Sequence, residues 1–237
     1  RYEAILDMLR AHMHQVDNVL PILITETGTL QNGRRPSDHW FRLMAYSAYL
    51  NKSMQRPDQI DLFIPFIFLH MSWNPNSGDA AFTPKPGVAK GWEKDDFDPT
   101  TVAHFFDLWQ DFDGQRLPVS FDHDWLDVTA VHDGKRISLA VTNLGGRQLA
   151  LDLSGVAKRI GAAKATQTRL NYQGGEVGFE AEHEVDAAAI PVDVNETTVI
   201  RLVMPENKTL APMGTLRQQR WYAEETAVKS SGEANVF

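Results

Sequence analysis

The stretch VLPILITETGTL, residues Val19–Leu30, decides the expected fold. It contains an apolar run without alternation, made of Leu20, Ile22, Leu23 and Ile24. Such a run is typical of a parallel strand covered on both faces, not of a half-exposed antiparallel strand. In barrels of parallel strands and helices, the chemistry lies at the carboxyl ends of the strands. Glu26 stands at this end, and we expect Gly28 to let the chain turn outward just after it. A Glu at this position can also be a solvated strand cap.

A strand–helix–strand order extends from this stretch. A helix is expected from Pro36 or Ser37, because Pro suits a first helical turn and Ser can cap it. A second apolar, aromatic-rich strand follows at Ile60–Leu69. This order predicts a right-handed crossover in a parallel sheet. A helix at Arg1–Val16 precedes the first strand, and another is expected between Asp98 and Gly114.

From Leu117 onward the pattern changes to short runs separated by turns such as Asp133-Gly134 and Gly174-Gly175. The predicted strands are Leu126–Val131, Ile137–Thr142, Gln148–Leu153, Ala165–Leu170, Ile190–Val194 and Thr197–Met204. Regularly spaced short strands indicate a β-sandwich. We therefore predict three regions: 1–118 as part of an α/β barrel, 119–204 as an all-β sandwich, and 205–237 as a linker and the start of a further β domain.

Composition narrows the classes of function. The 237 residues carry a net charge of -8, which argues against nucleic acid or an anionic membrane as a partner and fits an uncharged substrate. There is no cysteine, so a disulfide, a thiolate nucleophile and a Cys-based zinc site are excluded. The acidic run Asp95-Asp96-Asp98 lacks the ligand spacing of a calcium loop. We expect no metal and no cofactor, and we find no membrane-spanning run and no signal peptide.

Both ends of the sequence fall inside patterned segments. The chain opens on Arg1 within a helical pattern, and Lys229–Phe237 ends within what reads as an incoming strand. We therefore expect the chain to be part of a longer enzyme.

Four segments together carry a resemblance to a known family. They are PILITETG at 21–28, SDHWFRLMAYSAYLNKSM at 37–54, FIPFIFLHMSWNP at 63–75 and FFDLWQDFDGQRLPV at 105–119. The sequence resembles glycoside hydrolase family 86, whose members are β-agarases and β-porphyranases. The resemblance implies a retaining enzyme with a TIM-type (β/α)8 barrel, incomplete in this chain, followed by β-sandwich domains. It is strong in the first half and extends to the β-rich half as domain order.

The resemblance assigns roles to two residues. Glu26 matches the catalytic nucleophile at the end of the seventh barrel strand, and Trp73 matches the aromatic residue that floors the sugar site after the eighth. A retaining glycosidase also needs an acid/base carboxyl group about 5–5.5 Å from the nucleophile. In this superfamily it follows an Asn at the end of the fourth strand, which would lie before Arg1. Asn195-Glu196 falls in a turn of the β-rich half and is no replacement. We therefore expect residues 1–237 alone to be inactive.

Other candidates surround the expected site. An ionised nucleophile needs hydrogen-bond donors, and His39, Trp40 and His70 are candidates that also contribute to substrate binding. The alternatives are packing at a helix start for His39 and Trp40, and a satisfied strand-end histidine for His70. Trp73 can stack on a sugar or pack in a core, and Trp92 is a second platform candidate in the long Gly- and Pro-rich loop Asn74–Lys94.

The sequence thus predicts part of an endo-acting glycosidase that cleaves red-algal galactans, either agarose or porphyran. Two alternatives stay open: another retaining barrel glycosidase of a β-galactosidase-like kind, or a non-catalytic polysaccharide-binding β-sandwich. The aromatic residues that could serve binding in the β-rich half are Phe121, Trp125, Tyr172 and Phe179. The expected partner is a polysaccharide or oligosaccharide. The family implies a secreted or cell-envelope protein of a bacterium, and a monomer is our expectation.

Overall fold

The computed structural model describes residues 2–29, 33, 35–66, 68–69, 80–85, 97–121, 123 and 125–206. The first half contains α1 (Tyr2–Gln15), β1 (Ile22–Thr27), α2 (Pro36–Met54), β2 (Ile60–Pro65), β3 (Phe82–Pro84), β4 (Phe97–Pro99), the short 3-10 helix η2 (Thr101–Ala103) and α3 (His104–Trp109). The second half contains β5 (Gln115–Leu117), β6 (Leu126–His132), β7 (Arg136–Asn143), β8 (Leu149–Leu151), α4 (Ser154–Ile160), β9 (Lys164–Gln173), β10 (Glu176–Val185), β11 (Ile190–Val192) and β12 (Thr197–Val203). Residues 207–237, with the predicted further β element, lie outside the described residues.

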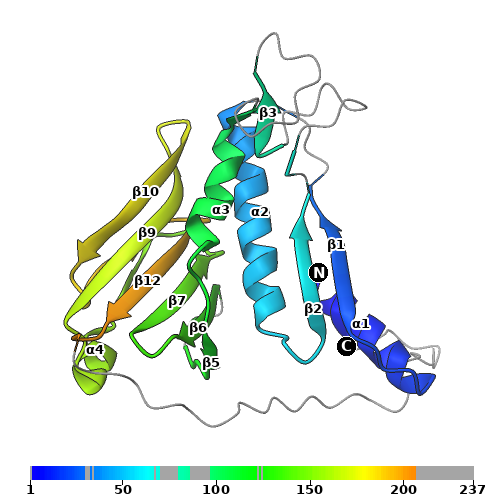
Figure 1. Cartoon of the computed structure of the whole chain (residues 1–237), viewed down its shortest axis with the longest axis horizontal. Coiled ribbons are helices and arrows are strands. Elements are labelled where there is room, and N and C mark those ends of the chain that lie inside the picture. The colour runs from blue at the N-terminus through cyan, green and yellow to red at the C-terminus, as the bar shows by residue number, and fades with distance from the viewer. Residues whose placement is uncertain are drawn as a thin grey trace, which may run out of the picture.

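The parallel pairing predicted around Val19–Leu30 is confirmed. β1 and β2 run side by side, with Ile22 opposite Ile60 and Ile24 opposite Phe63. α2 connects them and runs in the opposite direction beside them (Figure 1). The expectation that β1 is covered on both faces is not met by the described residues, because Leu23 is 58% exposed. Only the face toward α2 is packed there, and the two strands have no other partner strand among the described residues.

α2 begins at Pro36, as predicted, but Ser37 is not its cap. The carboxylate of Asp38 instead accepts the backbone N–H of Arg35 at 3.2 Å and the Arg35 guanidinium at 2.9 Å. Gly33 makes this arrangement possible. A Cβ at Gly33 would lie 1.8 Å from an Asp38 carboxylate oxygen, so no larger residue fits.

The predicted helix start at Asp98-Pro99 is wrong. These residues pair with β3 as part of β4, and the helical segment begins at Thr101. The reason is Thr100, whose hydroxyl accepts the N–H of Val102 and donates to the carbonyl of Ala80 at 2.8 Å. This cap stops helix propagation toward the N-terminus and ties the helix start to the segment before β3.

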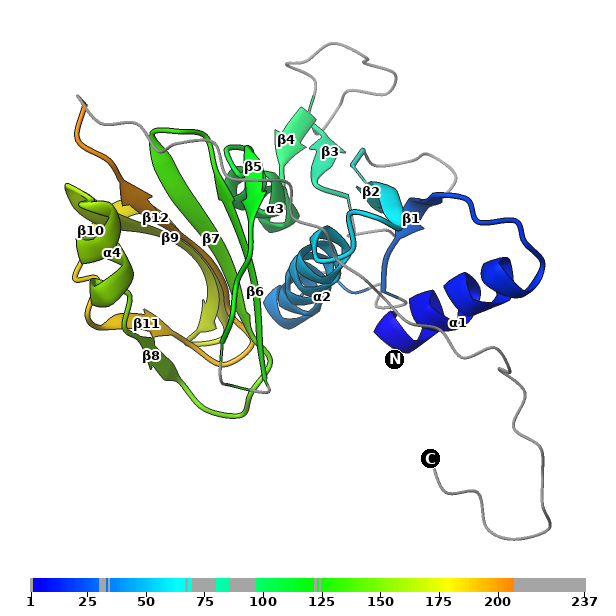
Figure 2. The ribbon, with the colours of Figure 1, turned by 90° about the horizontal axis from the view of Figure 1, so that it is seen from below.

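The six strands predicted in the β-rich half are all present. They belong to one antiparallel six-stranded sheet, in the order β10-β9-β12-β7-β6-β5, and to a two-stranded sheet formed by β8 and β11. α2 and α3 cover one face of the large sheet, and β8, β11 and α4 cover the other (Figure 2). The sheet begins at Gln115, slightly before the predicted boundary at 118, because β5 pairs with β6.

The two halves share one core. Leu43 of α2 and Leu108 of α3 pack in the same buried cluster as Ala140, Leu170 and Val199 of the sheet. Polar groups cross the same junction: Asn51 is fully buried and donates to the carbonyl of Asp127 at 2.9 Å. None of the helices within the described ranges is long and apolar enough to cross a bilayer. The sheet is therefore a fixed support for α2, and through α2 for the strand pair.

Candidate active site

Glu26 lies at the carboxyl end of β1, where the sequence placed it. The register changes at this point: Ile24 pairs with Phe63, and the next pair joins Thr27 to Pro65. Thr25 and Glu26 thus face the single residue Ile64, as in a β-bulge, which re-aims side chains. Regular alternation would place Glu26 on the helix-packed face with Ile24. Instead Glu26 is exposed and Thr27 is buried.

Several segments meet at this end of the strand pair. The carboxyl ends of β1 and β2, the first turn of α2 and the β3 strand lie together (Figure 1). The N–H of Phe66 donates to the carbonyl of Thr27 at 2.7 Å, which continues the pairing past β2. Gly28 is not required for the turn that follows. A Cβ there would meet the Phe66 carbonyl oxygen at an ordinary 3.7 Å, and its φ lies outside the left-handed region.

His39 lies half-buried in the first turns of α2. Its Nδ1 shares a hydrogen bond of 2.5 Å with the hydroxyl of Thr101, which joins α2 to η2. Trp40 is buried and stacks on Tyr172 of β9, with ring centroids 5.9 Å apart and planes inclined by 13°. These surroundings fit the packing alternative for Trp40. Within the described ranges, neither Trp40 nor His39 donates a hydrogen bond to Glu26.

The other predicted site residues, His70, Trp73 and Trp92, lie outside the described residues. Among the residues that are described, no side chain donates a hydrogen bond to the Glu26 carboxylate. No group of three His, Asp or Glu side chains in the same ranges is arranged to hold a metal ion.

Two buried charged residues near this end were missed by the sequence analysis. Arg42 is fully buried in α2, and its guanidinium donates to the carbonyl of Gly33 at 3.4 Å. Asp38, one helical turn earlier, is also buried. Their spacing of four residues places them on one helix face, and charged residues are rarely buried without a partner. The sequence signal that could have predicted this buried pair is an Asp and an Arg four residues apart, next to the apolar face of α2.

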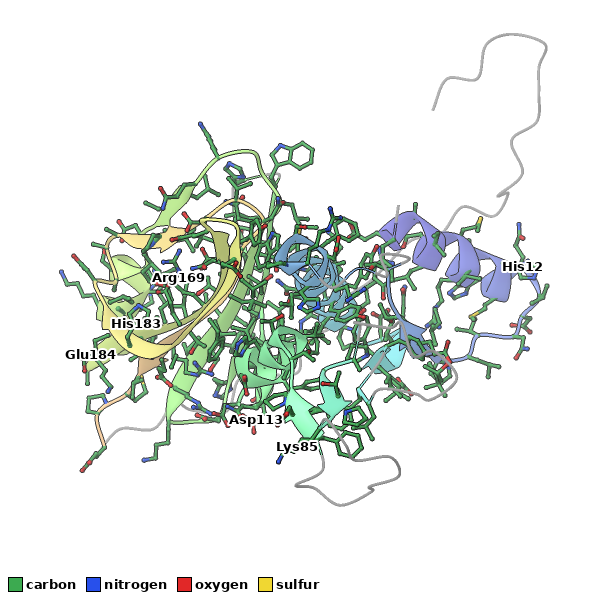
Figure 3. All side chains as sticks on the ribbon, turned by 90° about the horizontal axis from the view of Figure 1, so that it is seen from above. His12, Lys85, Asp113, Arg169, His183 and Glu184 are labelled. Atoms are coloured by element: carbon green, nitrogen blue, oxygen red, sulfur yellow. The ribbon has the colours of Figure 1, made fainter. Side chains whose placement is uncertain are left out.

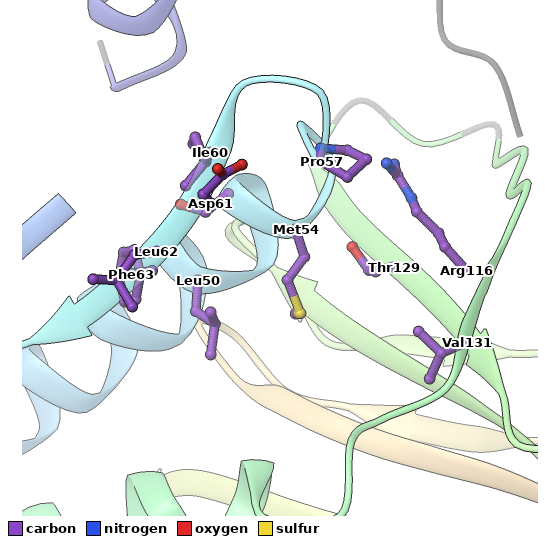
Figure 4. A pocket seen from close by; sticks show the side chains of 11 residues that line it. Leu50, Met54, Pro57, Ile60, Asp61, Leu62, Phe63, Arg116, Thr129 and Val131 are labelled. Atoms are coloured by element: carbon purple, nitrogen blue, oxygen red, sulfur yellow. The ribbon is translucent and has the colours of Figure 1, made fainter. Parts of the chain in front are cut away.

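A cavity, shown in Figure 4, lies away from the strand end that carries Glu26. It has a volume of about 340 Å³ and lies between the end of α2, the start of β2 and the sheet, with Met54, Ile60 and Val131 in its lining. The start of β2 is opposite to the strand end that carries Glu26. The cavity is therefore not part of the candidate active site.

Comparisons with known proteins agree with the resemblance. The chain is 24% identical over 254 residues to β-porphyranase A of Phocaeicola plebeius, covering 99% of this chain and 34% of the relative. It matches a solved β-porphyranase of glycoside hydrolase family 86 from Bacteroides plebeius with a TM-score of 0.71, at 22% identity over 86% of this chain and 38% of the other. The resemblance to glycoside hydrolase family 86 is confirmed.

Two further matches are consistent with this resemblance. The chain is 21% identical over 234 residues to the funoran endo-β-hydrolase of Wenyingzhuangia aestuarii, covering 94% of this chain and 32% of the relative. The fold also matches BuGH86 in complex with neoagarooctaose, with a TM-score of 0.71 at 20% identity over 87% of this chain and 35% of the other. No family model matches the chain. The chain spans about a third of the length of the curated relatives it matches, and those relatives are glycoside hydrolases.

Proposed function

We propose that residues 1–237 form part of a retaining endo-glycoside hydrolase that cleaves β-linked galactans of red algae. One observation carries the proposal: Glu26 is exposed at the irregular carboxyl end of a parallel strand that is followed by a helix and a second parallel strand. This is the position at which barrel enzymes hold their catalytic residues. The similarity to a porphyranase and a funoran hydrolase supports the substrate class.

In this proposal β1 and β2 are neighbouring strands of a (β/α)8 barrel. The relatives are about three times as long as this chain, which leaves room for the other strands. The exposed side chains of Leu23, Leu62 and Ile64 are the surface that the rest of the barrel would cover. The β-rich half supports the barrel through the core it shares with α2 and α3.

The reaction then divides between residues inside and outside this chain. The Glu26 carboxylate attacks the anomeric carbon of the sugar, and the glycosidic C–O bond breaks. An acid outside residues 1–237 protonates the departing oxygen, and the same group later takes a proton from the water that releases the sugar from Glu26. Trp73 offers its ring to the C–H face of a pyranose. His39, at the start of α2, holds the rim of the site.

The substrate follows from size and charge. A polymer cannot enter the cell intact, so we place the protein outside the cytoplasm, secreted or in the cell envelope, and we propose that it acts as a monomer. The net charge of -8 favours neutral agarose over an anionic galactan.

The test uses the full-length protein with agarose, porphyran and funoran in parallel, and measures reducing ends and the anomeric configuration of the first product by NMR. Retained β-oligosaccharides from one of these polymers support the proposal. No hydrolysis of any of them, or an inverted product, contradicts it.

One observation favours a second candidate function, polysaccharide binding by the β-rich half. Trp125 is 61% exposed beside the turn at Gly145, while its backbone is fixed by hydrogen bonds with His123 and Leu144. An exposed indole on a backbone that is held in place is a suitable sugar platform. Trp125→Ala would then weaken retention of the protein on insoluble agar at least tenfold without changing hydrolysis of a soluble oligosaccharide. Phe41→Ala, at a similarly exposed aromatic residue on α2, is the control. Equal retention of Trp125→Ala and wild type excludes this function.

A further inference from the structure

The end of β1 needs an external support, because its regular pairing is interrupted where Glu26 lies. Between the pairs Ile24–Phe63 and Thr27–Pro65, two residues of β1 face one residue of β2. A bulged strand loses part of its ladder, so the direction of its side chains depends on the contacts that follow. The contact that follows is the hydrogen bond from the N–H of Phe66 to the carbonyl of Thr27, at 2.7 Å.

Phe66 is itself held from the other side. Its carbonyl accepts a hydrogen bond from the hydroxyl of Tyr46, which lies in the middle of α2. A line of contacts thus runs from the Tyr46 hydroxyl through the peptide groups of Phe66 to Thr27, the residue next to Glu26. The two hydrogen bonds connect three places in the fold: the middle of α2, the residue that follows β2, and the end of β1.

Tyr46 is a rigid source for this support. Its side chain is 2% exposed, and its ring packs edge-on against Phe105 of α3, with centroids 5.9 Å apart and an interplanar angle of 85°. α2 is fixed in turn to the large sheet by the buried amide of Asn51, which donates to Asp127 and Ala140. A hydroxyl that is fixed in the core can hold a strand end more precisely than a side chain on a loop can.

We propose that Tyr46 is a positioning residue for Glu26: its hydroxyl holds the Phe66–Thr27 junction so that the carboxylate faces the anomeric carbon. This proposal rests on the proposed glycosidase function. Tyr46 is buried, and in this proposal it acts on Glu26 through the backbone of Phe66 and Thr27. Loss of the hydroxyl should therefore lower kcat and leave substrate binding unchanged.

The test is Tyr46→Phe in the full-length protein, which removes the hydroxyl and keeps the ring against Phe105. A displacement of about 1 Å at a reacting group can lower a rate roughly 100-fold, so we expect kcat to fall about 10- to 100-fold. KM should stay within twofold of wild type. The matched control is Tyr49→Phe, three residues along the same helix, whose ring packs on Tyr2 at 4.9 Å and whose hydroxyl makes no hydrogen bond with the described residues. It should keep wild-type kcat.

Rates are divided by the folded fraction, measured by circular dichroism on the same samples, so that partial unfolding is not counted as a loss of kcat. A kcat of Tyr46→Phe within twofold of wild type overturns the proposal. An equal loss in Tyr49→Phe also overturns it, and so does a change confined to KM. The variant Glu26→Gln distinguishes a failure of the positioning role of Tyr46 from a failure of the proposed glycosidase function. If Glu26→Gln is inactive while Tyr46→Phe is fully active, only the positioning role fails, and if Glu26→Gln is active, the proposed function itself fails.

Discussion

Arg169 and Glu196 form a buried ion pair in the large sheet, and the replacement Arg169→Met gives the sharpest stability prediction. The guanidinium of Arg169 in β9 donates two hydrogen bonds of 2.7 Å to the two carboxylate oxygens of Glu196. It also contacts Asp193 at 2.8 Å and Glu180 at 3.4 Å. Arg169 lies among the strands of the β-rich half (Figure 3), and Glu196 is fully buried. Methionine keeps most of the aliphatic volume and leaves Glu196 charged without its partner.

The expected cost follows from this geometry. Removing one partner of a buried pair destabilises a protein by about 3–5 kcal/mol, because the remaining charge stays buried. Because the sheet shares one core with α2 and α3, the unfolding unit is in the range of roughly 150–250 residues. For such a unit each kcal/mol lowers Tm by roughly 2–4 °C, so a fall of about 6–20 °C is expected. Arg159→Met in α4 is the control, because Arg159 is exposed. It should change stability by less than about 0.5 kcal/mol.

The loss should depend on pH in one direction. Burial already raises the pKa of Glu196, against the opposing hydrogen bonds from Arg169, and those bonds raise the pKa of Arg169. Without Arg169, the pKa of Glu196 in the folded state rises further above its value in the unfolded chain. A raised carboxyl pKa means that stability is retained below the unfolded pKa and is lost as pH rises through the folded pKa. The difference in the free energy of unfolding between wild type and Arg169→Met should therefore be smaller at pH 5 than at pH 8.

The assay is scanning calorimetry of the full-length protein at both pH values, with hydrogen exchange of β9 and β12 to assign the transition to the sheet. Arg169→Met combined with Glu196→Gln should recover part of the loss, because no buried charge remains. A loss below about 1 kcal/mol at pH 8 would refute the reasoning, since a breach of a buried pair costs more than this. A loss that is equal at pH 5 and pH 8 would also refute it.

Two further predictions concern the sugar site and the isolated chain. Trp73→Ala should lower kcat/KM at least tenfold while Tm stays within a few degrees, and a large fall in Tm at unchanged specific activity would show that Trp73 is a core residue. Residues 1–237 expressed alone should release no reducing ends from agarose or porphyran and should aggregate through the first half, where Leu23, Leu62 and Ile64 are exposed on a two-stranded sheet. Activity of this isolated chain that Glu26→Gln abolishes would prove that prediction wrong. It would also mean that a second carboxylate within the chain acts as the acid, and Asp79 and Glu93 in the long loop Asn74–Lys94 are the candidates.

The parts of the fold that the sequence predicted are those with strong local patterns. The unalternating run at β1, the helical period of α2 and the β-branched runs of β6, β7 and β12 need little tertiary context. β10 was missed because its sequence EVGFEAEHEV contains four glutamates and a glycine and no sustained apolar run, and it is a strand through its pairing with β9 at the edge of the sheet. The helix start at Asp98 was wrong because the cap at Thr100 depends on a carbonyl from a distant segment.

The site shows the same division. The strand-end position of Glu26 could be predicted from local sequence, but the register change at Thr25 and Glu26 could not, because it depends on the partner strand. Trp40 looked like a site residue from its place at a helix start, whereas Tyr172, more than 100 positions away, places it in the core. Contacts between distant segments also define the role proposed for Tyr46, which no local pattern indicates.

The nucleophile assignment of Glu26 is tested most directly by Glu26→Gln in the full-length protein, with Asp61→Asn on the neighbouring strand as the control. Glutamine keeps the shape of the exposed side chain at the end of β1 and removes the attacking carboxylate. Turnover of the polymer that the wild type cleaves should fall by several orders of magnitude with an unchanged Tm, while Asp61→Asn stays within a fewfold of wild type. A Glu26→Gln enzyme within tenfold of the wild-type rate would contradict the assignment.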